Sequence, residues 1–239
     1  MKKKILYLLT CVGLCWSSCT NEVDEFIGNV EPSTRSVSTA LNANLASLFT
    51  GGAPTLTSAE IKEVNDAYAK MTSINCYRNI DEAVRNKTSY AGTIFLDDTY
   101  ASAYFRKGSL AFPPYGILAS SMEHEFIHMY QRDVQGKKVD TDKEKRDTGM
   151  MEFELAFYQG IIRYIHAGYS WTFKGEDGDP SYQSLWTSGL TDPSLIDINE
   201  FVKWSNIFGE YSRGYSGKGY KFGNYDYGTS CINSLLKLY

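Results

Sequence analysis

The sequence predicts an α+β fold that is mostly helical and contains a small β-sheet. Apolar residues recur at helical spacing in three windows, at residues 57–71, 119–134 and 147–166. Between the first two windows, residues 92–96 and 100–112 have the composition of short strands bounded by turn residues. About 200 residues follow the N-terminal leader, which is enough for one domain with a sizeable core.

The chain begins with the composition of an export signal. Lys2-Lys3-Lys4 is basic, and residues 5–16 form an apolar run that is too short for a transmembrane helix. The following Ser17-Ser18-Cys19 resembles a bacterial lipoprotein signal, which implies lipidation of Cys19; a plain signal peptide is the alternative. We therefore expect an exported protein, lipid-anchored to the cell envelope at the outer membrane or cell surface.

The leader predicts that the chain is divided into three segments. We expect a signal peptide at residues 1–18, a lipid-anchored flexible tether at residues 19–40 and the folded domain at residues 41–239. The formal net charge is −4, and it becomes more negative when the leader takes three lysines with it. An acidic domain without a basic cluster argues against a nucleic-acid partner.

The helices of the domain have recognisable start signals. Thr57-Ser58-Ala59-Glu60 has the form of a capping box, and a shorter helix is expected around residues 80–85. Pro113-Pro114 separates the predicted strands from the helix at residues 119–134. After a charged loop at residues 136–146, Asp147 or Thr148 can cap a helix that runs to about His166.

Past Gly168 the chain is rich in Tyr, Trp, Gly, Asp and Ser. Asp177-Gly178-Asp179 is expected to be a turn, and Asp197 with Glu200 to cap a helix through about Phe208. Residues 211–227 interleave Tyr with Gly, which fits either a groove-lining loop or irregular packing against the helices; we expect the packing. Residues 229–238 are expected to form a last helix capped by Thr229.

Two cysteines lie beyond the leader and its anchor, Cys76 and Cys231. In an exported protein they form either one disulfide or two buried free thiols. Neither has the spacing to a second Cys or His that a metal or redox site needs.

The sequence His124-Glu125-Phe126-Ile127-His128 lies inside the window at residues 119–134 and has the form H-E-x-x-H. On a helix, His124 and His128 are one turn apart on the same face, so both rings can bind one zinc ion. Glu125 is about 100° round the helix, where it can act on a water at the metal as general base. The alternative is a surface helix with solvated His and Glu side chains.

Acidic residues at the start of the next helix complete a known pattern. Glu152 and Glu154 follow the second histidine of the motif at the start of the helix predicted at residues 147–166. Residues 119–166 thereby resemble the gluzincin zinc metallopeptidases, in which two histidines of one helix and a Glu of a downstream helix bind zinc. The resemblance implies a zincin-like domain with an active-site helix and a Glu-bearing helix. The longer metzincin pattern is absent, because Gln131 and Val134 stand in place of its Gly and third His.

We prefer Glu152 over Glu154 as the third ligand. Glu154 is expected to point towards the core with Phe157 and Ile161. Acidic residues in a first turn also interact favourably with the helix dipole, which is the ordinary explanation for either one. His166 is a weaker candidate, since its glycine-flanked surroundings are typical of a helix end.

The function that this resemblance implies is that of a zinc-dependent metallopeptidase in the cell envelope. His124, His128 and Glu152 would bind zinc, Glu125 would act as general base, and the substrate would be a peptide or protein. A strand before the motif resembles the edge strand with which zincins hold an extended peptide; a purely structural strand is the alternative. A different function is a surface lipoprotein that binds glycan or a partner protein, with a structural or vestigial metal site.

Overall fold

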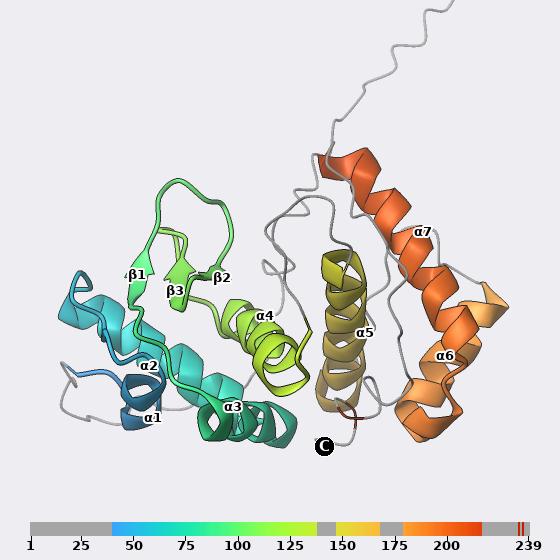
Figure 1. Ribbon diagram of the computed structural model, residues 1–239, viewed down its shortest axis with the longest axis horizontal. Coiled ribbons are helices and arrows are strands. Elements are labelled where there is room, and N and C mark those ends of the chain that lie inside the picture. Colours follow the sequence, from blue (N-terminus) through green and yellow to red (C-terminus); the bar gives the residue numbers. More distant parts are fainter. Residues whose placement is uncertain (1–39, 138–146, 168–178, 217–233, 235, 237–239) are drawn as a thin grey trace, which may run out of the picture.

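The computed structural model describes residues 40–137, 147–167, 179–216, 234 and 236. Within these residues the protein is mostly helical with one three-stranded sheet, which confirms the predicted α+β class (Figure 1). The helices are α1 (Ala43–Leu48), α2 (Ser58–Ser73), α3 (Asn75–Lys87), α4 (Ala119–Met129), the π-helical turn η1 (Tyr130–Val134), α5 (Asp147–Ala167), α6 (Pro180–Thr191), the 3-10 turn η2 (Pro193–Leu195) and α7 (Ile198–Ser216). The strands are β1 (Ile94–Leu96), β2 (Tyr104–Arg106) and β3 (Ser109–Phe112).

The sheet is mixed and has the strand order β1-β3-β2. The central strand β3 runs parallel to β1 and antiparallel to β2. Lys107 and Gly108 connect β2 to β3 with φ angles of 52° and 78°, which are the two positive values of a type I′ hairpin turn. The two strands of this hairpin confirm the strand prediction for residues 100–112, and the strand order leaves β2 at an edge of the sheet.

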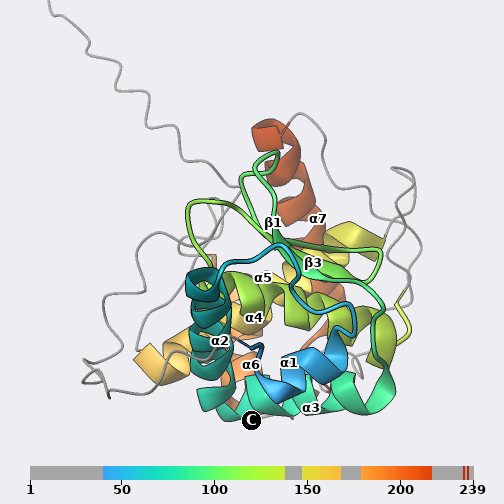
Figure 2. The same cartoon turned by 90° about the vertical axis from the view of Figure 1, so that its left-hand side faces the viewer.

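Helices α4 and α5 lie side by side in the middle of the molecule (Figure 1). The sheet and α1–α3 are on one side of this pair, and α6 and α7 are on the other. The orthogonal view shows the sheet and α3 at opposite ends of the same half, with α4 between them (Figure 2). Helix α4 contacts α2, α3, α5 and β2, so its position is fixed from several directions.

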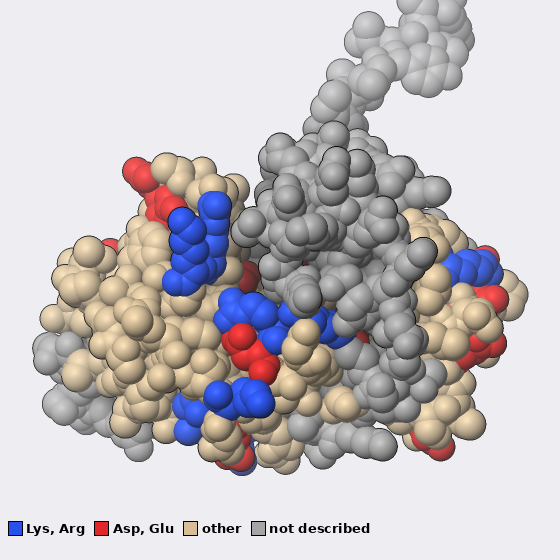
Figure 3. Space-filling model, viewed as in Figure 1, with Lys and Arg blue, Asp and Glu red and all other residues tan. Residues whose placement is uncertain are grey.

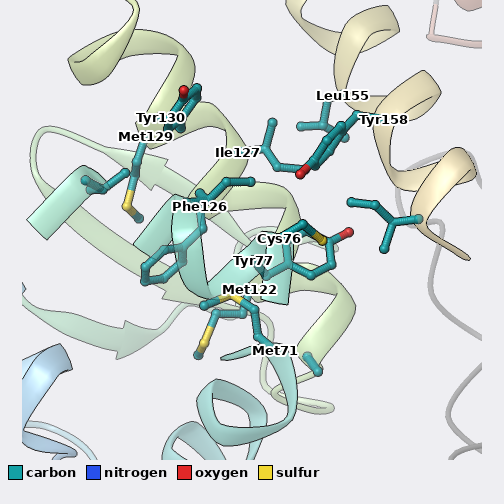
Figure 4. Close-up of a cluster of buried hydrophobic side chains, with 14 of the residues drawn as sticks. Met71, Cys76, Tyr77, Met122, Phe126, Ile127, Met129, Tyr130, Leu155 and Tyr158 are labelled. Atoms are coloured by element: carbon teal, nitrogen blue, oxygen red, sulfur yellow. The ribbon is translucent and has the colours of Figure 1, made fainter. Parts of the chain in front are cut away.

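The buried face of α4 forms the centre of the hydrophobic core. In Figure 4 its side chains lie among residues of α2, α3 and α5. The ring of Phe126 lies 6.1 Å from that of Tyr68 on α2, and Tyr77 of α3 meets Tyr158 of α5 edge-on at 6.3 Å. Burying a side chain of this size stabilises the fold by about 1.5–3 kcal/mol. Four apolar side chains of α4 are 0% exposed: Met122, Phe126, Ile127 and Met129.

Local sequence signals located the start of α2 correctly. The Thr57 hydroxyl accepts a hydrogen bond from the Glu60 N–H at 3.3 Å, and the Glu60 carboxylate accepts one from the Thr57 N–H at 2.6 Å. This reciprocal pair confirms the predicted capping box. The next helix, α3, spans Asn75–Lys87 and is longer than the predicted segment at residues 80–85.

Two helices were not predicted, α1 and α6. Helix α6 begins after Asp179, whose carboxylate accepts a hydrogen bond from the Ser181 N–H at 2.8 Å. Asp179, the last residue of the predicted turn, is therefore the N-cap of this helix. Its Ser, Thr and Gly residues have low helix propensity, and packing against α5 and α7 compensates for this. Such packing cannot be recognised in the local sequence.

Helix α7 continues to Ser216, beyond the end predicted near Phe208. Asp197 caps it as expected, since its carboxylate accepts a hydrogen bond from the Asn199 N–H at 2.8 Å. Residues 211–216 are therefore helical, and neither a groove-lining loop nor irregular packing is correct for them. Glycines such as Gly209 and Gly214 cost a helix about 1 kcal/mol each, which does not end it. The sequence-based prediction ended the helix too early because it treated these glycines as terminators.

Several expectations lie outside the described residues. These are the signal peptide, the anchor at Cys19, the tether, Cys231 and most of the last predicted helix, in which Ser234 and Leu236 are helical. Cys76 is a buried free thiol, and burial raises its pKa to about 11. Of the helices that the structure describes, none combines the length and the apolar character needed to cross a bilayer.

Gly92 marks the closest approach of two backbone segments in the sheet region. A Cβ atom at this position would lie 2.2 Å from the carbonyl oxygen of Gly108 and 2.3 Å from Oγ of Ser109. The Gly108 contact is with main chain, which cannot rotate away. The β2–β3 hairpin therefore packs against residues before β1 only because position 92 has no side chain.

We expect Gly92→Ala to destabilise the protein by about 2–3 kcal/mol, because the methyl group forces the hairpin away. Equilibrium unfolding in urea measures this change. Ala91→Ser, at the exposed neighbouring position, serves as the control and should change stability by less than about 0.5 kcal/mol. Equal stability of the two variants would contradict the close packing.

Candidate metal centre

Three side chains from two helices meet where α4 contacts α5. Helix α4 supplies His124 and His128 from successive turns, and the second turn of α5 supplies Glu152. One nitrogen or oxygen atom from each of the three lies within 4.8 Å of the other two. In the part of the chain that the structure describes, no other three His, Cys, Asp or Glu side chains form such a group.

The distances between these atoms are those found around a single ion. Nε2 of His128 lies 3.1 Å from Nε2 of His124 and 3.2 Å from Oε1 of Glu152. Nε2 of His124 lies 3.7 Å from the other oxygen, Oε2, of Glu152. Tetrahedral zinc with bonds of 2.0–2.2 Å separates its ligand atoms by about 3.4 Å. Two imidazole nitrogens and a carboxylate oxygen are also a donor set that zinc accepts.

The group is partly open to solvent. The side chains of His124, His128 and Glu152 are 33%, 16% and 21% exposed. A structural zinc site usually has four protein ligands, whereas a catalytic site has three and keeps one position for water or substrate. Among the described residues the group offers three ligands, which would leave one position of a bound tetrahedral ion for water or substrate.

The charges of the group depend on one another. Burial and the charge of His128 together lower the pKa of His124 to about 4, against the opposing attraction of Glu152. Burial also acts to lower the pKa of His128, but the charge and hydrogen bond of Glu152 outweigh it and raise that pKa. Burial acts to raise the pKa of Glu152, and the attraction of His128 reverses the effect and lowers it. His128 and Glu152 thus hold a proton between them where a bound cation would replace it.

Glu125 lies on α4 next to the ligand group but outside it. Its side chain is 5% exposed, and burial raises its pKa to about 7, against the opposing attraction of His128. The backbone of Phe105 in β2 lies close enough to the carboxylate to oppose part of this rise. Glu125 therefore faces the edge strand, with a pKa close to neutral pH, which is suitable for a general acid or base.

The two alternatives to Glu152 lie elsewhere. Glu154 is 1% exposed, forms an ion pair with Lys137 and accepts a hydrogen bond from Gln131 Nε2 at 2.7 Å. His166 is exposed in the last turn of α5. The structure places Glu152 beside the histidines and places neither Glu154 nor His166 there.

Three features around the group were not predicted from the sequence. One is the π-helical turn η1, which directly follows α4 and contains Gln131. Another is the buried set formed by Gln131, Lys137 and Glu154. The third is the approach of the Phe105 backbone to Glu125. Each depends on tertiary packing, and a π-helical turn is a frequent feature of functional sites.

No protein-family model matches this sequence, and comparisons with curated proteins and with solved structures also gave no match.

We expect the protein to bind about one zinc ion per chain, and His124→Ala or His128→Ala to lower the affinity by more than about a hundredfold, because each removes a ligand. Glu152→Ala should have a comparable effect. Competition with a chromophoric chelator measures these affinities on the purified full-length protein.

His166→Ala is the matched control, since it removes the chain's third histidine without touching the ligand group. It should bind zinc as the wild type does. Equal zinc affinity of His128→Ala and His166→Ala would show that the group does not bind the metal.

Proposed function

We propose that the protein is a zinc-dependent metallopeptidase of gluzincin type with a zincin-like α+β fold, anchored in the cell envelope. The observation that carries this proposal is the convergence of His124, His128 and Glu152 at the spacing of one tetrahedral ion, with Glu125 beside them. The sequence resemblance over residues 119–166 assigned these four residues the same roles. Geometry and sequence pattern thus support the same interpretation.

Zinc held by the two histidines and Glu152 would supply Lewis-acid chemistry, acidifying a water molecule and polarising the carbonyl of the scissile bond. The protein must then accept a proton and deliver it to the leaving amine. Glu125 is the group placed for both steps, because it is adjacent to the ligands and its pKa is near 7. A carboxylate with an ordinary pKa would accept the proton less readily.

The strand β2 is in position to orient a peptide substrate. The Leu110 N–H bonds to Thr93 O on the β1 side of β3, so in the Phe105–Leu110 pair the Phe105 N–H points away from β3. The backbone of Phe105 approaches Glu125, so this side of β2 faces α4, which carries the candidate ligands. An extended peptide paired with this edge would lie along α4, with its main chain close to Glu125.

The charges on the described part of the surface in Figure 3 are mixed in sign. On the described part of the face in Figure 3, Lys and Arg side chains lie beside Asp and Glu near the middle of the molecule. Arg132 and Asp133 are an example of such a neighbouring pair. A mixed surface of this kind fits a protein or peptide substrate better than nucleic acid.

We expect Glu125→Gln to slow peptide hydrolysis by at least about a hundredfold, because it removes the proton acceptor and keeps the side-chain shape. Zinc content should stay unchanged, since Glu125 is not a ligand. Incubation with a mixed peptide library, followed by mass spectrometry of new termini, identifies a cleavable substrate and gives the rates.

The matched control is Glu123→Gln, which changes another buried glutamate of α4 outside the ligand group. This variant should cut at close to the wild-type rate. A zinc-loaded Glu125→Gln protein that cuts as fast as the wild type would rule out the mechanism, and it would favour a binding protein with a structural metal.

The envelope location rests on Ser17-Ser18-Cys19 after the apolar run of the leader. We expect Cys19→Ala to abolish incorporation of a labelled fatty acid and to release the protein from the membrane fraction. Ser18→Ala keeps the cysteine and should remain labelled. Unchanged labelling of Cys19→Ala would contradict the lipid anchor.

A further inference from the structure

Three buried polar side chains lie behind His128, at the ring nitrogen that faces away from the ligand group. Gln131, Lys137 and Glu154 are 0%, 3% and 1% exposed. They are connected, because Glu154 Oε2 accepts hydrogen bonds from Gln131 Nε2 at 2.7 Å and from the Lys137 ammonium group. Gln131 Oε1 lies 3.0 Å from Nδ1 of His128. The set therefore ends on a candidate metal ligand.

The orientation of the Gln131 amide is determined by its surroundings. Its Nε2 also donates to the carbonyl oxygen of Met151 at 3.1 Å, so it faces two acceptors on α5. Reversing the amide would place its oxygen against those two oxygens. Because Nε2 must face α5, Oε1 must face His128.

This orientation fixes the proton on the His128 ring. An amide oxygen can only accept a hydrogen bond, so Nδ1 of His128 must be the donor. Whether the ring is neutral or charged, Nδ1 carries a proton, and Nε2 is the nitrogen that can be vacated for a metal ion. That nitrogen is the one facing His124 and Glu152, at 3.1 and 3.2 Å.

The arrangement costs stability that an apolar set of the same size would not cost. Removing a Lys–Glu pair from water carries a desolvation penalty. Among the described residues, moreover, Oε1 of Glu154 has no hydrogen-bond partner. Helix packing alone does not require such groups, whereas orienting Gln131 does.

We propose that Gln131 is a positioning residue that orients His128 for metal binding, and that the Lys137–Glu154 pair holds Gln131 in place. This inference rests on the proposed zinc site. The π-helical turn η1 supplies this residue from just beyond the motif helix. Partners of this kind typically contribute tenfold to a hundredfold to metal affinity.

The test compares the zinc affinity of the full-length protein with that of Gln131→Met, which keeps the side-chain length and removes both hydrogen-bonding groups. Gln159→Met is the matched control, since Gln159 is 5% exposed and lies outside the ligand group, where its Nε2 donates to the Ser120 carbonyl oxygen at 3.5 Å. We expect Gln131→Met to bind zinc tenfold to a hundredfold more weakly, and Gln159→Met to bind within about threefold of the wild type. With cobalt in place of zinc, the d–d spectrum should change only in Gln131→Met.

A second comparison remains decisive where Gln131→Met folds poorly. Gln131→Glu keeps an acceptor for Nδ1 of His128 but places two carboxylates together, at positions 131 and 154. Adding Glu154→Gln restores a donor–acceptor pair, with the carboxylate now at position 131 and the amide at position 154. The double variant should bind zinc at least about fivefold more tightly than Gln131→Glu alone.

Unchanged zinc affinity and an unchanged cobalt spectrum in folded Gln131→Met would overturn this inference, as would a double variant no better than Gln131→Glu. A wild-type protein that binds no zinc would overturn it together with the proposed function. Zinc binding that depends on Gln131, without any peptide hydrolysis, would leave this inference standing and reject only the peptidase.

Discussion

The packing of α4 against α5 is the contact on which the candidate centre depends. Ligand atoms from the two helices lie 3.2–3.7 Å apart, so a small separation of the helices would disperse the group. Ile127 of α4 and Leu155 of α5 are both buried in the shared core, and Gln131 donates across the contact to the Met151 carbonyl oxygen at 3.1 Å. The remaining elements support this contact from outside, with α2, α3 and β2 against α4, and α6 and α7 against α5.

The candidate centre brings together ionisable side chains whose burial carries a free-energy cost. Burial displaces the pKa of His124 downwards to about 4 and that of Glu125 upwards to about 7, which is a cost to the charged form in each case. Functional sites are where such displaced values are most often found. A cation bound at the group would compensate the negative charge of Glu152, the carboxylate that lies beside the two histidines.

The sequence predicted what depends on local spacing. The two histidines are one turn apart wherever their segment is helical, and periodicity identified that helix and the next one. Glu152 was chosen over Glu154 from the faces of one helix, which the same periodicity defines. The sequence could not predict the π-helical turn, the Lys137–Glu154 pair or the approach of Phe105 to Glu125, since each depends on packing that is set by the whole core. Helix α6 escaped prediction for the same reason.

The division of the ligands between two helices has a mechanical consequence. An ion bound there would cross-link the half of the molecule that contains the sheet to the half that contains α6 and α7 (Figure 1). Any motion that separates the two halves would have to break a metal–ligand bond. Zinc occupancy and the separation of the halves would therefore be thermodynamically linked. At a free zinc concentration a thousandfold above the dissociation constant, zinc binding would stabilise the state in which the halves are in contact by about 4 kcal/mol. The supply of the metal would thereby regulate how rigid the protein is, as well as whether it can react.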